Sequence, residues 1–529
     1  MLFTSYGFLA FLVAVFALYY LAPRKWQWGI LLVASYVFYA FAGLQYLFFI
    51  LLTTISSYLV ARLLSRARRR EEDYLSLHKE DMDKEARKAY KAGQKKKRFR
   101  ILCLGLVLNF GVLAVLKYTG FAVYNLNGIL GAIGKEPLTI PSLLLPMGIS
   151  FYTFQTMGYL IDVYRAKVEA EKNPARLALF VSFFPQLVQG PISRYSDLAD
   201  QLYAEHRFDG RTFTSGLWRI LWGFFKKLVI ADRVLVAMNT LLDAPNEYRG
   251  AYVLLLILLY SVQIYADFTG GIDITIGIAE SLGIRLAENF DRPFSSTSTK
   301  EYWRRWHITM GTWFTDYVFY PISVCRPMMK LSKWSRAKLG TAVGKRIPVY
   351  LATIVTWFLT GLWHGAGWNF IVWGLLNCAV ILISQECEPL YRRFHKKFPK
   401  LEASRLYHDF AATRTFLLMG LIRSLDCYRN VGTSFRMWGT MLTTWNYGEL
   451  FGTGLLSLGL SVADFVILAL AVLLVFFVSR LDAKGSVREW LYDRPVRGAV
   501  IAVALLTVVL LFGAYGHGYD ASQFIYNQF

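Results

Sequence analysis

The sequence predicts an all-α protein that crosses a membrane many times, and composition, apolar segments and charge placement carry this prediction. Of the 529 residues, 55% are hydrophobic, and the mean hydropathy of +0.37 is too high for a soluble globular protein. Many windows hold the roughly 20 apolar residues that a spanning helix needs. The formal net charge of +22 resides in polar stretches between those windows, so we expect membrane orientation and no nucleic-acid partner. Because hydrocarbon offers backbone groups no hydrogen bonds, each span is expected to be a helix.

The first three spans are expected from Phe8 to Leu21, from Ile30 to Phe41 and from Tyr46 to Leu64. No cation precedes the first apolar run, and Arg24 and Lys25 follow it, so this run is not expected to be a cleavable signal peptide. The same order favours an N-terminus outside and a first loop inside.

A polar segment from Ser65 to Arg100 follows, with a basic run at each end and mixed charges between them. Its alternating charges favour a solvated helical hairpin. Three spans from an external N-terminus place this segment in the cytoplasm, where the positive-inside rule also places it. An orientation anchor explains the cations, and contact with anionic lipid or with a nucleotide-bearing donor is the alternative.

The rest of the chain continues with shorter or interrupted apolar segments. They are 101–116, 143–163, 177–191, 213–238, 252–284, 349–363, 357–380, 411–421, 462–478 and 500–515. The stretch 121–142 holds two asparagines and two prolines and is expected to be a re-entrant or external piece. Prolines also interrupt 177–191, which is expected to line a cavity, because irregular backbone at membrane depth needs cover. We expect about eleven spans together with re-entrant and amphipathic helices.

Charged residues inside two of these segments need partners or water. Asp267 and Asp273 interrupt a long apolar run, and we expect them to pair with arginines further along the chain. The cations Lys226, Lys227 and Arg233 are expected to face water.

The segment from Trp357 to Val380 is the expected centre of the protein. It reads WFLTGLWHGAGWNFIVWGLLNCAV, and His364 is its one side chain whose ordinary pKa lies near neutral pH. A titratable group at membrane depth costs free energy, so this histidine is a functional candidate. Small residues flank it and let another backbone or a substrate approach, while Trp363 and Trp368 supply flat apolar walls. The alternative is a core histidine that a neighbouring helix satisfies.

The less hydrophobic stretch 288–321 precedes this segment and is expected to hold an amphipathic helix. At helical spacing Trp303, Trp306 and Met310 share one face of it. His307 lies beside that face.

The five cysteines suggest neither a metal site nor a disulfide framework. They form no CxxC pair, and their odd number argues against a set of purely intrachain disulfides. They are Cys103, Cys325, Cys378, Cys387 and Cys427. Most lie in or next to apolar segments, where a thiol behaves as a small hydrophobe, and we expect no bound metal.

Several motifs match a known family. WRRWHITMGTWFTDY, followed by GLWHGAGWNFIVWG, resembles the membrane-bound O-acyltransferase family in motif order, in the two histidines and in their spacing. The upstream YADFTGGIDITIGIAESLGIRLAENFDRPF fits the same family. The segments LPMGISFYTFQTMGYLIDVYR, FFPQLVQGPISRY and the terminal FIYNQF are similar to one branch, the bacterial alginate and peptidoglycan O-acetyltransferase membrane components. The teichoic acid D-alanyl transferases are more distant. The resemblance covers most of the chain.

This resemblance implies a single membrane-bound O-acyltransferase domain over residues 1–529, with a basic cytoplasmic loop at 65–100 and a catalytic core at 287–380. It implies a funnel of helices around a tunnel, with the defining histidine, His364, at the narrow part and His307 as the second histidine. An activated acyl group would enter from the cytoplasm and leave on a hydroxyl outside. After TDYVFYP the chain reads ISVCRPMMK where many relatives have a proline-leucine-glycine-glycine turn, which leaves the local loop and a partner contact open.

The chemistry of the residues is compatible with that function. Acyl transfer from a thioester to an alcohol needs a base, and an imidazole with an unperturbed pKa of about 6.5 suits that task near neutral pH. No serine or cysteine lies next to His364 in the sequence, so a covalent enzyme intermediate is not indicated. Trp363, Trp368 and Asn369 are expected to position the acyl donor.

The role of the second histidine stays open at this point. His307 is either a second polar contact in the tunnel or a structural hydrogen-bonder to Asp316 or Asp267. Trp306 and Asp316 are further candidates for substrate contact.

The sequence therefore favours an enzyme that moves an acyl group across the cell (inner or plasma) membrane to a cell-envelope or exported polysaccharide. The group is expected to be acetyl and the donor acetyl-CoA, with no tightly bound cofactor. Membrane lipid and an extracytoplasmic serine-hydrolase-like acyltransferase are the expected partners. The alternatives are D-alanyl transfer to teichoic acid, a transporter or channel, and a non-catalytic polysaccharide-export component, although the repeated halves of many transporters are not evident.

Overall fold

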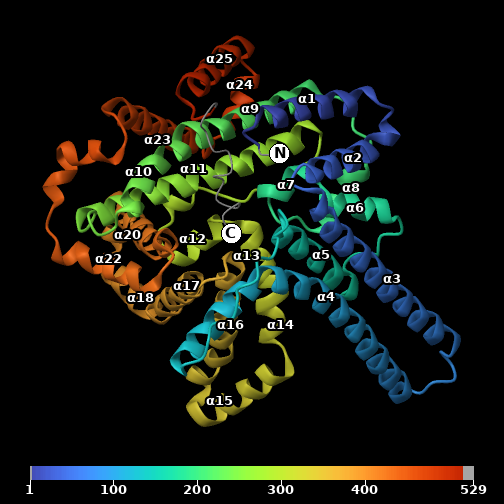
Figure 1. Cartoon of the computed structure of the whole chain (residues 1–529). Helices are drawn as coiled ribbons and strands as arrows, with labels where there is room; N and C mark the ends of the chain where they lie inside the picture. The colour runs from blue at the N-terminus through green and yellow to red at the C-terminus, as the bar shows by residue number, and fades with distance from the viewer. Residues whose placement is uncertain (1–2, 516–529) are drawn as a thin grey trace. The chain divides into compact units, whose positions relative to one another are not determined.

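The computed structural model describes residues 3–515, and the regular elements in that part of the chain are helices (Figure 1). The chain divides into two compact units. The first comprises Met1–Phe213 and Ala279–Leu286, and the second comprises Thr214–Ile278 and Ala287–Phe529. The prediction of an all-α protein is confirmed. The terminal FIYNQF lies outside the described residues.

Seven helical segments within residues 3–515 are long and apolar enough to cross a membrane. They are Leu44–Leu77, Lys84–Ala132, Ala251–Ser281, Arg346–His364, Trp368–Glu386, Val462–Asp482 and Pro495–Phe512. The prediction of a polytopic membrane protein is confirmed. Other segments that we expected to span form shorter helices, namely α1 (Tyr6–Leu21), α2 (Gln27–Ala40) and α5 (Ile149–Tyr164). The number of about eleven spans therefore stays a prediction.

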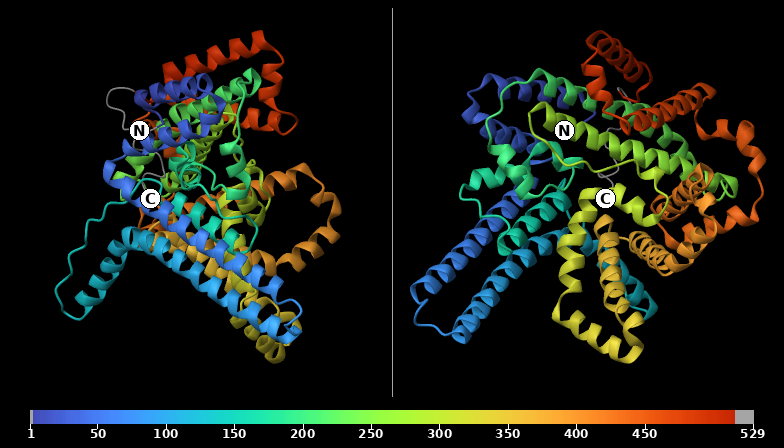
Figure 2. Two further views of the ribbon diagram at one scale, coloured as in Figure 1. Left: turned by 90° about the vertical axis from the view of Figure 1, so that its right-hand side faces the viewer. Right: turned by 180° about the vertical axis from the view of Figure 1, so that it is seen from behind.

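The first unit contains a long antiparallel hairpin of α3 (Leu47–Leu77) and α4 (Lys84–Ala132). Figure 1 and both views of Figure 2 show the two helices side by side. The outer part of this hairpin is the basic segment 65–100, so the helical hairpin that its alternating charges favour is present. An ion pair between Arg98 and Glu71, at 2.5 Å, joins the two helices there.

Helix α4 continues through a stretch that we expected to be broken. It runs to Ala132 because its asparagines find partners: Asn125 Nδ2 donates to Phe121 O at 2.7 Å. Asn127 exchanges two hydrogen bonds with the backbone of Leu138, at 2.7 and 2.8 Å, and so ties the following turn to the helix. The break that we expected is therefore not found in the helical first half of 121–142, and the placement of this stretch as a re-entrant or external piece stays a prediction.

The remaining helices of the first unit are short. They are α6 (Pro174–Ser182), α7 (Phe184–Gln189) and α8 (Tyr195–Tyr203). The break between α6 and α7, just before Pro185, confirms the predicted interruption. Every residue of α7 is buried, so its irregular backbone has the protein cover that membrane depth requires. That it lines a cavity stays a prediction.

In the second unit, glycines let two helical segments approach closely. The segments are α9 (Gly210–Phe224), continued by the π-helical η3 (Phe225–Ala231), and α11 (Ala251–Ser281). A Cβ at Gly223 would lie 2.6 Å from Gly270 O, and a Cβ at Gly277 would lie 2.7 Å from Gly216 O. The antiparallel backbones therefore touch at two points, where a side chain would not fit.

The same helix pair buries the charges that interrupt α11. Lys227 bridges Asp267 and Asp232, both at 2.7 Å, with side chains that are almost fully buried. Lys226 pairs with Asp273 at 2.5 Å. The predictions that the lysines face water and that the aspartates pair with arginines further along are wrong, because antiparallel packing sets the two elements face to face. Burial is tolerated because each charge is paired.

The second unit contains further helices, and the candidate site lies on some of them. They are α10 (Asp232–Asp243), α12 (Thr299–Arg305), α13 (Ile308–Phe314), α14 (Tyr320–Ser323), α15 (Arg326–Gly344), α16 (Arg346–His364), α17 (Trp368–Glu386), α18 (Glu388–Lys397), α19 (Pro399–Glu402), α20 (Arg405–Arg423), α21 (Leu425–Tyr428), α22 (Val431–Thr443), α23 (Val462–Asp482), α24 (Val487–Tyr492) and α25 (Pro495–Phe512). The predicted amphipathic helix is thus two short helices, α12 and α13, with His307 between them.

Candidate active site

His364 is the last residue of α16, close to the turn that leads into α17. Glycines make the tight packing of these two helices possible. A Cβ at Gly361 would lie 2.4 Å from Phe370 O, and one at Gly374 would lie 2.4 Å from Trp357 O. We expected the small residues here to admit either another backbone or a substrate, and the structure shows the approach of another backbone.

The half-buried imidazole of His364 lies among indoles. Its ring centroid is 4.9 Å from that of Trp363 and 4.6 Å from that of Trp373, and both contacts are edge-on. Trp373 contacts Trp303 at 5.5 Å, and Trp303 Nε1 donates to Asn377 Oδ1 at 3.1 Å. These contacts fix the walls around the imidazole.

His307 lies in the turn between α12 and α13, with its backbone in the left-handed region (φ 50°, ψ 53°). Its ring is fully buried, 4.9 Å from Phe268 and 5.9 Å from Trp363 between centroids. A side chain in this backbone conformation costs free energy, so the surroundings must hold it there.

Asn289 is the residue that holds His307 on its Nδ1 side. Asn289 Oδ1 lies 3.2 Å from His307 Nδ1 and accepts hydrogen bonds from Thr309 N at 3.1 Å and Thr309 Oγ1 at 2.9 Å. Asn289 was not singled out by the sequence analysis, although it lies in the ENFDRPF part of a quoted motif. Asn289 precedes His307 by 18 residues, a separation at which the sequence pattern gives no signal of contact.

Burial also sets the charge of His307. Removal from water lowers the pKa of this imidazole to about 3. The ring is therefore neutral at physiological pH and acts through hydrogen bonds, not as a cation.

Trp306 packs against a buried arginine. The indole stacks on Tyr302 with centroids 5.7 Å apart, and the guanidinium carbon of Arg423 lies 3.9 Å from the indole centroid. Arg423 Nη2 donates to the Tyr302 hydroxyl at 2.6 Å. This cation–π contact holds the residue that precedes His307. Arg423 was also missed, because a single arginine at the end of a mixed helix gives no sequence signal.

The other predicted site residues lie on elements that adjoin the histidines. Asn369 is buried in the first turn of α17, and its Nδ2 donates no hydrogen bond within the described structure. Trp368, the first residue of α17, is half exposed. Asp316 lies in the π-helical turn η5 (Thr315–Phe319) that follows α13. Ring contacts bring His307, Trp363 and His364 together, and Asn369 offers a polar group nearby in the chain.

Residues 3–515 contain no group of three or more histidine, cysteine, aspartate or glutamate side chains that could hold a metal ion. The five cysteines are free thiols. The side chains around His307 and His364 offer imidazole, amide and indole groups for chemistry.

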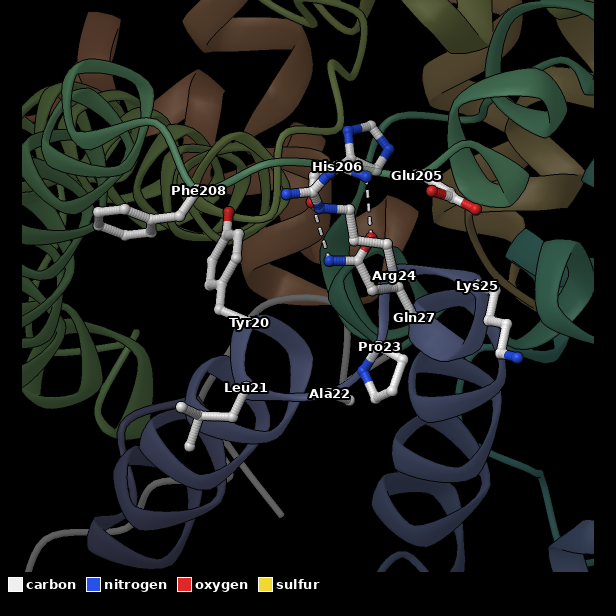
Figure 3. A pocket seen from close by; sticks show the side chains of 10 residues that line it. All are labelled: Tyr20, Leu21, Ala22, Pro23, Arg24, Lys25, Gln27, Glu205, His206 and Phe208. Atoms are coloured by element: carbon white, nitrogen blue, oxygen red, sulfur yellow. Dashed lines mark hydrogen bonds between the residues drawn. The ribbon is translucent and has the colours of Figure 1, made fainter.

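A pocket of about 680 Å³ in the first unit contains none of the predicted site residues. Figure 3 shows it between the α1–α2 turn and the loop that carries His206, where Gln27 exchanges two hydrogen bonds with the His206 backbone, at 2.8 and 2.9 Å. Its lining residues are Tyr20, Leu21, Ala22, Pro23, Arg24, Lys25, Gln27, Glu205, His206 and Phe208. Because most of them are exposed, the pocket is a surface hollow.

Comparison with known families and proteins gives consistent matches. The model of the membrane-bound O-acyltransferase family matches residues 172–404, which include both histidines. A probable alginate O-acetylase of Azotobacter vinelandii is 32% identical over 507 residues, which cover 95% of this chain and 88% of the relative.

Two further relatives extend the comparison. The peptidoglycan O-acetyltransferase of Helicobacter pylori is 31% identical over 77% of this chain and 73% of its own length. The teichoic acid D-alanyltransferase of Bacillus subtilis is 27% identical over 51% of this chain and 65% of its own length.

Proposed function

The chain belongs to the membrane-bound O-acyltransferase family, and we propose that this O-acyltransferase moves an acetyl group from a cytoplasmic thioester to a cell-envelope or exported polysaccharide. The names of the relatives, alginate O-acetylase and peptidoglycan O-acetyltransferase, support an acetyl group and a polysaccharide acceptor. In this proposal acetyl-CoA is the donor, and an extracytoplasmic serine-hydrolase-like partner completes the transfer.

The convergence of His307 and His364 on Trp363 is the observation that carries the proposal. The two imidazoles come from separate segments, and both contact this buried indole, at 5.9 and 4.9 Å. Polar groups that meet inside an apolar surrounding are rarely kept for stability alone, because their desolvation is costly.

His364 acts as the general base in the proposed reaction. Its imidazole takes the proton from the attacking hydroxyl while the hydroxyl oxygen forms a bond to the thioester carbonyl carbon. The carbon–sulfur bond then breaks, and the proton passes to the leaving thiolate. The products are an ester and a free thiol, with no covalent enzyme intermediate. The surrounding indoles keep water from competing with the hydroxyl.

The other site residues bind and orient the substrates. Asn369 donates to the thioester carbonyl oxygen, and Trp363 and Trp368 form the wall along the donor. Trp306 and Asp316 contact the substrate on the side of the site that carries His307. The unused Nδ2 of the buried Asn369 supports its assignment.

We place the protein in the cytoplasmic (inner) membrane with the N-terminus outside and the basic hairpin inside. The cations of segment 65–100, in the outer part of the α3–α4 hairpin, support this orientation. A cysteine at the exposed Ala92, in a variant without the native cysteines, should resist a membrane-impermeant thiol reagent in intact cells. Rapid labelling would overturn the orientation.

D-alanyl transfer to teichoic acid is the second candidate, and the relative from Bacillus subtilis favours it. It has less support, because that match covers about half of this chain, whereas the alginate O-acetylase match covers 95%. Mass spectrometry of envelope polymers from cells with and without the gene separates the two, through the mass of the group that is lost.

The direct test of the proposal is His364→Gln in proteoliposomes supplied with labelled acetyl-CoA and the partner hydrolase. Loss of a general base should lower the transfer rate by about a hundred- to ten-thousandfold, or roughly 3 to 5 kcal/mol in barrier. Acetyl-CoA binding should persist, because the base acts on the hydroxyl proton. His364→Ala should lose transfer as well.

His408→Gln is the matched control, because this histidine is exposed on α20. It should keep wild-type transfer. If a folded His364→Gln protein keeps more than about a tenth of wild-type transfer, His364 contributes less than about tenfold to the rate. The assignment of His364 as the general base would then be wrong.

A further inference from the structure

A hydrogen bond joins Asn289 to His307, and a neighbouring donor fixes its direction. The backbone N–H of Thr309 can only donate, and it points to the same side-chain atom of Asn289 as His307 does, at 3.1 Å. That atom must therefore be the amide oxygen. An amide oxygen carries no hydrogen, so Nδ1 of His307, 3.2 Å away, must be the donor.

The position of one proton fixes the chemistry of the other ring nitrogen. His307 is neutral, because burial lowers its pKa to about 3. A neutral imidazole holds one ring proton. With that proton on Nδ1, Nε2 carries the lone pair and accepts hydrogen bonds.

The segment that bears Asn289 is itself anchored. Glu288 accepts two hydrogen bonds from Arg219, both at 2.6 Å, and Arg219 also donates to Asp273 at 2.9 Å. On the other side, Ile308 N donates to Asn289 O at 3.0 Å. A residue held from both sides can impose one geometry on its neighbour.

Backbone bonds next to Asn289 also hold the turn around His307. An isolated antiparallel bridge joins Phe290 to Trp306, and Asp291 N donates to Arg305 O at 2.9 Å. These bonds hold the backbone of His307 in its left-handed conformation. Backbone strain kept in place at a candidate site indicates that the orientation of this side chain matters.

We propose that Asn289 is a positioning residue: it holds the ring proton of His307 on Nδ1, so that Nε2 accepts a hydrogen bond from the attacking hydroxyl. This inference rests on the proposed acyl transfer. His307 orients the hydroxyl, and the neighbouring base, His364, removes its proton. The bound hydroxyl is thereby aimed at the thioester carbonyl before the bond forms.

Several charges on the elements packed against His307 are paired before any substitution. On α11 Asp267 pairs with Lys227. On α12 Arg305 pairs with Glu301 at 2.8 Å. The other charged or titratable groups of these elements are Asp273 and Glu280 on α11, Lys300 and Arg304 on α12, Asp316 in η5, His364 on α16, and the Arg219–Glu288 pair. The pKa of the buried His307 is set by burial, and a new charge beside it would dominate its titration.

The first test variant is Asn289→Asp. It keeps the oxygen that accepts from His307 and Thr309, and it removes no hydrogen bond that the structure describes, because Nδ2 of Asn289 is buried without a partner there. The new carboxylate beside His307 raises the proton affinity of the imidazole–carboxylate pair. Near neutral pH this pair therefore holds one more proton than the His307–Asn289 pair of wild type does. When this proton is on Nε2, the ring donates and cannot accept.

We expect Asn289→Asp to transfer acetyl from labelled acetyl-CoA poorly near pH 6.5 and to recover as the pH rises toward 9. When kcat is plotted against pH, its fall on the acid side should occur at higher pH than in wild type. The second variant, Asn289→Ser, buries no charge and is too short to reach Nδ1. It should lower kcat on the order of tenfold or more at every pH, with the KM for acetyl-CoA unchanged.

Asn109→Asp is the matched control for burying a carboxyl group, because Asn109 is a buried asparagine of α4 that hydrogen-bonds Ser56 and Gly105. Its kcat profile should keep the wild-type shape. A purely structural role for Asn289 predicts less folded protein but an unchanged profile for the folded fraction.

A folded Asn289→Asp protein with the wild-type pH profile, or an Asn289→Ser protein with wild-type kcat, would overturn the inference. If Asn289→Asp does not fold, the kcat of Asn289→Ser decides alone. If the wild-type protein shows no transfer, the proposed function is wrong. The pH dependence of the unfolding temperature then still tests whether Asn289 holds the ring proton of His307 on Nδ1. Asn289→Asp should then lose less stability than wild type between pH 8 and pH 5, and equal losses would contradict it.

Discussion

His307 and His364 contact the same indole, that of Trp363, with ring centroids 5.9 and 4.9 Å away. One histidine comes from the turn between α12 and α13, and the other ends α16. Because Trp363 is buried between these segments, its size sets how the two imidazoles are spaced. A single side chain therefore couples packing to the geometry of the proposed reaction.

Replacement of this indole should impair catalysis beyond its effect on folding. Trp363→Leu removes the shared wall and leaves unfilled volume, which costs about 1 to 3 kcal/mol or more of stability in a packed core. We expect kcat to fall by roughly tenfold or more, because displacement of a reacting group by about 1 Å can lower a rate about a hundredfold.

The comparison for this variant is Trp445→Leu, since Trp445 is 83% exposed. Acetyl transfer and the amount of folded protein should both be measured. A Trp363→Leu protein with wild-type kcat would show that the spacing of the imidazoles does not depend on this side chain.

The buried His307 should make the protein less stable in acid. Below about pH 6.5 the unfolded chain binds a proton at this residue, whereas the folded chain does so only near pH 3. The unfolded state binds more protons throughout that window, so the free energy of unfolding falls as the pH is lowered through it. The contribution is fully present above pH 6.5.

His307→Asn is the variant that isolates this effect. Asparagine tolerates the left-handed backbone of His307 better than alanine does, and it has no group that titrates here. Unfolding temperatures in detergent should fall less for His307→Asn than for wild type between pH 8 and pH 5. Parallel curves would mean that another group controls acid stability. Acetyl transfer should be strongly reduced in His307→Asn at every pH.

Sequence reasoning found the parts of the fold that local patterns encode. Continuous apolar runs predicted the spanning helices, and prolines predicted the break between α6 and α7. The two histidines stood out because the surrounding segments are apolar and carry a known motif order. These features depend on residues close together in the chain.

Partners across the fold could not be predicted in the same way. Asp267 and Asp273 need cations, but hydropathy does not say which helix lies opposite, and Lys227 and Lys226 turned out to be the partners. Asn289 reaches His307 through an irregular turn, where no helical period applies. The sequence did hold one unused signal, since Gly216 and Gly223 recur at the same spacing as Gly270 and Gly277.

The buried lysine of η3 should be essential for folding. Lys227→Met would leave Asp267 and Asp232 buried without their cation, which costs about 3 to 5 kcal/mol when one partner of a buried pair is removed. The yield of folded protein and its unfolding temperature in detergent should both fall sharply. Lys400→Met, at an exposed lysine of α19, should behave as wild type. Equal stability of the two variants would mean that this ion-pair group contributes little.

Where α9 and α11 approach closely, a glycine-to-alanine substitution has two opposing effects on stability. Alanine in place of a helical glycine favours the helix by roughly 0.5 to 1 kcal/mol. At Gly223, however, the added Cβ would lie 2.6 Å from Gly270 O and 2.9 Å from Ile274 N, both backbone atoms that cannot rotate away. Overpacking of this kind costs about 1 to 3 kcal/mol, so Gly223→Ala should be destabilising. Gly93 of α4 is exposed, and a Cβ added there would have no neighbouring heavy atom within 4 Å. Gly93→Ala should therefore gain the helix propensity of alanine without a steric cost. The unfolding temperatures of the two variants should therefore shift in opposite directions from wild type, and a shift of both upward would mean that the two helices do not touch at this glycine.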